Sequence, residues 1–450
     1  MPITTSLPFE IRTDEILKAL AENGQYKHLQ MLEGPMGASV RMRQADGSVR
    51  ECLCFCSNNY LGLANHPEVV EAGIQGLRDF GAGTSSVRFI CGTFSPHERL
   101  EATIAEFLGV EASYTFVSCW NANEAVFPTL CEKGDIVISD ELNHASLIDA
   151  IRLMSSIKKG TLKAIFKHND HASLREKLEA ARANADVTGQ IWVVTDGVFS
   201  MEGDIADLAG LRRLCDEFDA LLVVDDSHGQ GVMGETGRGV HEFAGMYAPW
   251  TGEVGSENRP TTHVSSESRP TTHVSSESRP TTHVSSESRP TNGRVDVFTG
   301  TLGKALGGGA GGFVAGDRRV AELLVQRGRP TLFSNALPVT VACSANAAIR
   351  ILMREPERVA KLRDNVAYAR EQIKAAGFDV LESPTAICPI IVHDTARAIS
   401  MSKRLLELGV FVIGFGFPVV PEGEARLRVQ ISAAHEREHI DGLVDALNKR

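Results

Sequence analysis

The chain has 450 residues, of which 43% are hydrophobic and 23% charged, and its formal net charge is −11. This length predicts two to three domains or one large enzyme domain with an appendage, and the acidic balance argues against a nucleic-acid-coating protein. We expect no membrane span, because no apolar run approaches about 18 residues, and no signal peptide. Nine cysteines are too dilute for a disulfide scaffold, so a reduced, cytoplasmic setting is expected.

Between residues 110 and 301, short β-rich runs alternate with helical stretches. This alternation is typical of a doubly wound α/β domain with a mostly parallel sheet. Ligands of such sheets bind outside the carboxyl ends of the strands, so polar residues at those ends are candidates for a site. The β-rich runs are 110–118, 135–139, 163–168, 190–197, 220–228 and 295–301, and helices are expected at 173–185 and 207–220.

A decapeptide, RPTTHVSSES, occurs three times without change from Arg259 to Ser288. The biased segment 256–292 has 37 residues, and only three of them, all valines, are hydrophobic. Such a composition cannot offset the backbone entropy of folding, so we expect a disordered insertion. Its three evenly spaced histidines also fit a metal-binding tract, but a duplication in a tolerant surface loop is the simpler interpretation.

After about residue 340 the pattern changes to that of a smaller α+β domain. We therefore divide the chain into an N-terminal segment 1–57, a large domain 58–335 and a small C-terminal domain 336–450. The expected elements of the last part are a long helix at about 341–376, a strand at 387–393, a helix at 395–408, strands at 410–415 and 425–431, and a helix from about 436.

The strongest chemical signal is TGTLGKALGGGAGG at 299–312, in which Lys304 stands among small residues at a strand end. A lysine amine attacks carbonyl groups when its surroundings lower its pKa, and glycines let the backbone approach a flat cofactor. A phosphate-binding loop is excluded because Ala305 follows the lysine, and a strand-like run follows the glycines where a dinucleotide fingerprint needs a helix. A Schiff-base lysine and a structural glycine-rich loop remain the two interpretations.

The second signal is VVDDSHG at the end of an apolar strand. Asp225 there is placed to pair with a protonated ring nitrogen, and His228 lies one step beyond it. The structural alternative is a helix N-cap formed by Asp226 or Ser227.

Two further junctions precede helices. His144 in DELNHASLID is placed to stack on an aromatic ligand or simply to cap its helix, and the backbone amides of Cys119 and Trp120 would form an anion site. His435 and His439 match the zinc-protease pattern H-E-x-x-H. They lie too close to the end of the chain for a third ligand at the usual distance, so we expect no metal there.

Eight motifs in this order resemble the α-oxoamine synthases, which are fold-type I pyridoxal phosphate (PLP) enzymes. Their resemblance implies PLP as the cofactor and a large domain with a mostly parallel sheet plus a smaller C-terminal domain. The motifs are SNNYLGLANHPEVV, SSVRFICGTFSPHERLE, DELNHASLIDAIRL, TDGVFSMEGDIA, VVDDSHGQGVMGETGRG, TGTLGKALGG, RPTLFSNALP and FPVVPEGEARLRVQISAAH.

Within that family the likeness is greatest to members that condense glycine with acetyl-CoA. The implied products are 2-amino-3-oxobutanoate and CoA, in a reversible step of threonine catabolism. Members that use glycine with succinyl-CoA, alanine with a pimeloyl thioester, or serine with a palmitoyl thioester are the alternatives. A repeat-bearing binding protein without catalytic activity is the alternative from another class.

The resemblance also implies roles around the PLP ring. Lys304 would hold PLP covalently and later shuttle the α-proton of glycine. Asp225 would pair with the ring nitrogen, His228 would contact the ring hydroxyl, and His144 would stack on the ring. Ser200 would lie beside the ring hydroxyl and the reacting carbonyl.

For the phosphate of PLP, the resemblance implies the backbone of Cys119 and Trp120 together with Thr301. Ser334 would reach the phosphate of the other subunit, which implies a homodimer with shared active sites. Arg428 would bind the substrate carboxylate, with Asn58 nearby, since a guanidinium pairs bidentately with a carboxylate. No nucleic-acid or membrane partner is expected.

Overall fold

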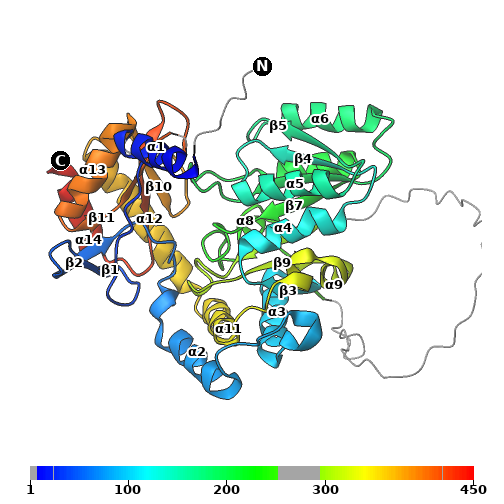
Figure 1. Ribbon diagram of the computed structural model, residues 1–450, viewed down its shortest axis with the longest axis horizontal. Helices are drawn as coiled ribbons and strands as arrows, with labels where there is room; N and C mark the ends of the chain where they lie inside the picture. Colours follow the sequence, from blue (N-terminus) through cyan, green and yellow to red (C-terminus); the bar gives the residue numbers. More distant parts are fainter. Residues whose placement is uncertain (1–7, 24, 252–293, 418, 450) are drawn as a thin grey trace, which may run out of the picture.

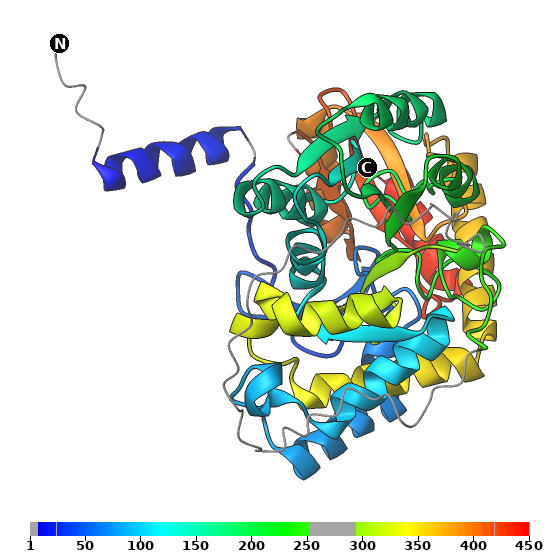
Figure 2. The same cartoon turned by 90° about the vertical axis from the view of Figure 1, so that its right-hand side faces the viewer.

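The computed structural model describes residues 8–23, 25–251, 294–417 and 419–449. The repeat 256–292, for which we expected disorder, lies outside these residues. Figure 1 shows a large sheet with its helices beside a second part built from the C-terminal elements together with strands β1 and β2. Helix α1 (Phe9–Glu22) has no buried residue and projects away from the rest of the chain (Figure 2).

The large sheet has seven strands in the order β3-β9-β8-β7-β6-β4-β5. All neighbouring strands pair in parallel except β9, which runs antiparallel to both its neighbours. The predicted mostly parallel α/β sheet is therefore confirmed. The strands are β3 (Ala112–Phe116), β4 (Ile136–Asp140), β5 (Leu162–Phe166), β6 (Ile191–Asp196), β7 (Ala220–Asp225), β8 (Val297–Thr301) and β9 (Gly312–Gly316).

Helices cover both faces of this sheet, so its central strands are apolar on both sides. Val137 and Val223 belong to one hydrophobic cluster, whereas Ile138 and Val224 belong to the other. This alternation follows from the two-residue period of a strand. The helices of this part are α3 (Ser95–Leu108), α4 (Cys119–Leu130), α5 (Ala145–Ile157), α6 (His171–Ala183), α7 (Leu208–Glu217), α8 (Val240–Phe243), α9 (Arg318–Arg327) and α10 (Arg329–Phe333), with the short turns η1 (Leu63–Asn65) and η2 (Arg88–Gly92).

Two three-stranded sheets form the second part. Strand β13 lies between β10 and β12, and β2 lies between β1 and β11. The early strands β1 and β2 thus share a sheet with a strand from near the end of the chain. The elements are β1 (Ser39–Arg43), β2 (Val49–Cys54), β10 (Ile387–His393), β11 (Val410–Phe411), β12 (Ile413–Phe415), β13 (Ala425–Gln430), α13 (Thr395–Glu407) and α14 (Arg437–Asn448).

The single long helix expected at 341–376 is wrong, because the structure has two helices there. They are α11 (Val339–Arg354) and α12 (Glu357–Ala375). Pro356 follows Glu355, whose φ of −125° lies outside the helical region. The ring of a proline disfavours the helical conformation of the residue before it, which explains the break. Helix α11 packs against α2 (Pro67–Phe80).

Among the described residues, no helix is both long and apolar enough to cross a membrane.

Candidate active site

A cavity of about 200 Å³ opens at the carboxyl ends of the strands of the large sheet. Sequence segments up to 185 residues apart meet there because parallel strands bring their carboxyl ends to the same edge. Seven residues expected from the sequence line it: Cys119, Trp120, His144, Asp225, His228, Thr301 and Lys304.

Asp225 ends strand β7 and is buried. Its Oδ2 accepts a hydrogen bond from Nδ2 of Asn123 at 2.7 Å, and its Oδ1 accepts one from the backbone N–H of Ser227 at 3.1 Å. The same amide of Asn123 also donates to Oγ of Ser146 at 2.8 Å. Charge-assisted hydrogen bonds of this kind hold a carboxylate in one orientation, so Asp225 is fixed at the cavity wall.

Asp196 ends the neighbouring strand β6 and stands in register with Asp225. Burial, reinforced by the negative charge of Asp225, raises the pKa of Asp196 well above its ordinary value. Its Oδ1 faces the backbone N–H of His144 at 3.3 Å, and its own backbone N–H donates to Oδ1 of Asn143 at 2.7 Å. Asp196 therefore ties the loop that carries His144 to the edge of the sheet.

Lys304 lies in the turn after strand β8, inside the cavity. Burial lowers the pKa of its amine, and the carboxylate of Asp225 opposes that shift. Thr301 fixes the start of the same turn, because its Oγ1 accepts from the N–H of Gly303 at 3.1 Å and donates to the carbonyl of Gly311 at 3.2 Å. The turn thus holds a half-buried lysine whose amine loses its proton more readily than that of a free lysine.

His144 caps helix α5, and its Nδ1 lies 2.8 Å from Oγ of Ser146. Burial lowers the pKa of its imidazole. The ring of Trp120 meets it edge to face, with centroids 6.2 Å apart and an interplanar angle of 78°. His144 therefore caps the helix, as the structural alternative expected, and also lines the cavity.

His228 joins the cavity to a polar chain formed by residues between strand β2 and the turn η1. Its Nδ1 lies 2.9 Å from the hydroxyl of Tyr60, and that hydroxyl donates to Oδ1 of Asn58 at 3.1 Å. Burial and the nearby Lys304 lower the pKa of His228 well below its ordinary value, and burial raises the pKa of Tyr60 to about 12. Both groups are therefore neutral at neutral pH.

Arg428 lies on strand β13 and is 7% exposed. Its Nε and Nη2 have no hydrogen-bond partner among the described residues. A buried guanidinium with unpaired donors is costly unless an anion binds to it. The geometry of this side chain therefore suits an anionic ligand group.

The N-terminus of helix α4 forms another wall of the cavity. Ser118 caps it by accepting from the N–H of Asn121 at 3.1 Å. The N–H groups of Cys119 and Trp120 belong to the first turn, which has no acceptors within the helix, and the helix dipole adds positive potential there. This end of α4 is suited to bind a phosphate.

Not every expected residue lines the cavity. Ser200 follows Val198, which does line it, but Ser200 itself does not. Ser334 lines a separate pocket with Arg88. Asn58 and Arg428 also stand outside the cavity.

Three residues near the site were missed as functional residues. Asn123 lies four residues after Cys119 on α4, which puts both on one face of the helix. Ser146 follows His144 by two residues, a spacing typical of local caps. Tyr60 lies within the motif SNNYLG, but no local pattern shows that it reaches His228, which is 168 residues away.

His435 and His439 face the backbone. Nδ1 of His435 accepts from the N–H of Ser432 at 3.1 Å, and its Nε2 lies 3.0 Å from the carbonyl of Cys54. Nδ1 of His439 accepts from the N–H of Glu436 at 3.0 Å. In the described part of the chain, no cluster of three or more metal-ligating side chains occurs.

Residues 50–447 match the family model described as aminotransferase class I and II. The chain is 40% identical to 2-amino-3-ketobutyrate coenzyme A ligase of Salmonella typhimurium, with 97% of this chain and 96% of the relative covered. It is 37% identical to 8-amino-7-oxononanoate synthase of Alkaliphilus metalliredigens, with 97% and 95% covered. Its structure is similar to that of Sphingomonas wittichii serine palmitoyltransferase, with a TM-score of 0.80, 27% identity, and 98% and 96% covered.

Proposed function

The chain belongs to the aminotransferase class I and II family, and we propose that it is a PLP-dependent acyltransferase that condenses glycine with acetyl-CoA. The products are 2-amino-3-oxobutanoate and CoA, and the step is reversible. The likeness to a ligase named for 2-amino-3-ketobutyrate over nearly the whole chain supports this substrate pair. The observation that carries the chemistry is a half-buried lysine that lines one cavity with a fixed, buried aspartate.

The residues of the cavity fit PLP. The amine of Lys304 suits its aldehyde, and the carboxylate of Asp225 suits a protonated ring nitrogen. The open N–H groups of Cys119 and Trp120, with the hydroxyl of Thr301, suit its phosphate. Bound PLP supplies an electron sink for negative charge at the α-carbon of the amino acid.

Two histidines complete the ring site. We assign His144 to stacking on the ring and His228 to its hydroxyl. Both are neutral because burial lowers their pKa values. His228 is oriented by Tyr60, whose hydroxyl lies 2.9 Å from its Nδ1.

Arg428 binds the carboxylate of glycine in this proposal, with Asn58 nearby. The unpaired Nε and Nη2 of the guanidinium support the assignment, because a carboxylate accepts two parallel hydrogen bonds from such a fork. Ser200 stands in the loop beside the cavity and is assigned to the reacting carbonyl.

Lys304 carries the proton transfers. Its lowered pKa increases the fraction of neutral amine, which is the form able to accept the α-proton of glycine. The amine then holds this proton at the wall of the cavity. The carboxylate of Asp225 stabilises the positive charge of Lys304 when the amine holds the proton.

We further propose a cytoplasmic homodimer in which Ser334 reaches the phosphate site of the partner subunit. Its place in a pocket apart from the cavity of its own chain supports a role across the interface. Light scattering coupled to size-exclusion chromatography should give twice the 48.6 kDa chain mass.

Lys304→Ala tests the assignment of the lysine. We expect no measurable CoA release, and no PLP attached to the chain after borohydride reduction, as read by mass spectrometry. Lys163→Ala, at an exposed lysine of strand β5, is the matched control and should retain both properties. A PLP adduct in the Lys304→Ala variant would contradict the assignment.

A substrate panel tests the choice of reaction, for which the likeness to 8-amino-7-oxononanoate synthase supplies the main alternative. CoA release is measured for glycine, alanine and serine, each with acetyl-, succinyl-, pimeloyl- and palmitoyl-CoA. We expect kcat/KM for glycine with acetyl-CoA to exceed every other pair by roughly tenfold or more, which corresponds to about 1.4 kcal/mol. A preference for alanine with pimeloyl-CoA would replace the proposal by the synthase reaction.

A further inference from the structure

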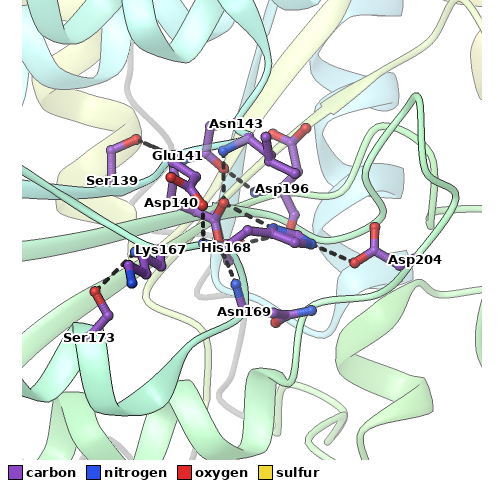
Figure 3. A network of polar contacts seen from close by, with 12 residues as sticks. Ser139, Asp140, Glu141, Asn143, Lys167, His168, Asn169, Ser173, Asp196 and Asp204 are labelled. Atoms are coloured by element: carbon purple, nitrogen blue, oxygen red, sulfur yellow. Dashed lines mark hydrogen bonds and ion pairs between the residues drawn. The ribbon is translucent and has the colours of Figure 1, made fainter. Parts of the chain in front are cut away.

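His168 stands between two carboxylates at the edge of the large sheet, outside the cavity (Figure 3). Its Nδ1 lies 3.1 Å from Oδ1 of Asp140, and its Nε2 lies 2.6 Å from Oδ2 of Asp204. The imidazole and Asp140 side chains are 20% and 1% exposed, so the contact is largely shielded from water. Two carboxylates on opposite nitrogens of one ring are satisfied together when both nitrogens carry a proton.

The surroundings favour that charged form. Burial opposes it, but the hydrogen bonds and charges of Asp140 and Asp204 outweigh burial and raise the pKa of His168 to about 10. The backbone N–H of His168 also donates to Oε1 of Glu141 at 2.9 Å. At neutral pH the ring is therefore a cation that bridges two anions.

Asp140 connects this bridge to the large sheet. It ends strand β4 and accepts from the N–H groups of Leu142 and Asn169 at 2.9 and 3.0 Å. Leu142 precedes the loop residues that end at His144 in the cavity wall. One end of the bridge is thus anchored to the sheet and to the loop of His144.

Asp204 belongs to a loop that borders the cavity, residues 197–206 after strand β6. The loop is closed by hydrogen bonds of 3.0 Å from the N–H of Phe199 to the carbonyl of Asp204 and from the N–H of Ala206 to the carbonyl of Gly197. The ring of Phe199 also packs edge to face on His168, with centroids 4.3 Å apart.

The loop faces both the cavity and the second part of the molecule. Val198 lines the cavity and precedes Ser200 by two residues. The carbonyl of Met201 accepts from Nη1 of Arg426 at 3.1 Å. Arg426 stands two residues before Arg428 on strand β13. The loop is therefore hydrogen-bonded to the strand that carries the proposed carboxylate-binding residue.

We propose that His168 is a positioning residue: as a cation between Asp140 and Asp204 it holds the loop 197–206, and with it Val198 and Ser200, against the cavity. The kinetic part of this inference rests on the proposed function, whereas the position of the loop does not.

The test is His168→Phe, which keeps an aromatic ring against Phe199 but removes both hydrogen bonds. Amide hydrogen exchange is measured on PLP-loaded protein without substrate. We expect the amides of Phe199 and Ala206 to exchange at least tenfold faster than in the wild type, while the helices α11 and α12 are unchanged. His168→Gln retains a hydrogen-bond donor and should show a smaller acceleration of exchange. This variant keeps the proposal testable if His168→Phe does not fold.

His171→Phe is the matched control. His171 is a neighbouring histidine that faces Asp207 at 3.4 Å and is more exposed, with 37% of its side chain accessible. We expect its loop exchange to match the wild type. Unchanged exchange at 197–206 in His168→Phe would overturn the proposal, and so would an equal acceleration along the whole chain, since that indicates general destabilisation.

Kinetics supply the second readout. For glycine and acetyl-CoA, kcat/KM of His168→Phe should fall roughly tenfold or more and recover in part in His168→Gln, because positioning is lost with the bridge. Faster loop exchange with unchanged kcat/KM would overturn the positioning role. Wild-type protein that fails to turn over these substrates would instead contradict the proposed function, and the exchange result would stand independently.

Discussion

At the scale of single residues, Asn123 determines how Asp225 is held. Asn123 is fully buried, and its side-chain amide donates hydrogen bonds to Oδ2 of Asp225 and Oγ of Ser146. Removing a buried donor leaves its partner unpaired, which costs about 1–3 kcal/mol. The orientation of the aspartate therefore depends on a residue that does not line the cavity.

We predict that Asn123→Ala weakens PLP binding by roughly tenfold, which corresponds to about 1.4 kcal/mol. The physical reason is that Asp225 loses its 2.7 Å partner. Fluorescence titration of the apoenzyme with PLP measures the change. Glu124→Ala, one position along the same helix, should bind PLP as the wild type does, and equal affinities for all three proteins would contradict the prediction.

His168 is a single residue that makes the stability of the fold depend on pH. The pKa of His168 in the folded protein is about 10, above the 6.5 of an ordinary histidine. Its contribution to stability is therefore complete below pH 6.5 and is lost as the pH rises through about 10. The Tm of the wild type should exceed that of His168→Phe by more at pH 6 than at pH 10. A difference that is constant or grows with pH would show that the ring is neutral in the folded protein.

At the scale of elements, the approach of strand β9 to helix α4 positions the phosphate-binding end of that helix. A Cβ on Gly312 would lie 2.3 Å from Cα of Cys119, a distance that requires the backbone to move. We predict that Gly312→Ala lowers stability by about 1–3 kcal/mol and weakens PLP binding, measured by thermal denaturation and PLP titration. Gly83→Ala meets no atom within 4 Å and should change neither, so equal losses in both variants would refute this account.

At the scale of the whole molecule, the two ends of the segment that carries the repeat lie close together. Trp250 and Arg294 line one groove, at the opposite end of β7 and β8 from Lys304. A short link can therefore join them. We predict that deletion of 256–292 leaves kcat/KM and the dimer mass within a few-fold of the wild type, measured by CoA release and light scattering. Loss of soluble protein on deletion would show that the segment is needed for folding.

The alternation of strands and helices in the large sheet, and seven of the residues that line the cavity, could be predicted from the sequence. Apolar runs identify buried strands, and polar residues at their carboxyl ends must meet at one edge, as Asp225 and Thr301 do. The break between α11 and α12 also has a local signal, because Pro356 disfavours the helical conformation of Glu355. Local signals of this kind need no knowledge of distant partners.

Which distant side chains meet depends on the tertiary structure. Tyr60 reaches His228 across 168 residues, and Asp204 reaches His168 across 36. Such contacts depend on how segments far apart in the chain pack against the edge of the sheet, and the hydrophobic periodicity of the sequence does not encode them. The same packing sets the burial that shifts the pKa of Lys304, because desolvation depends on every neighbour around the amine.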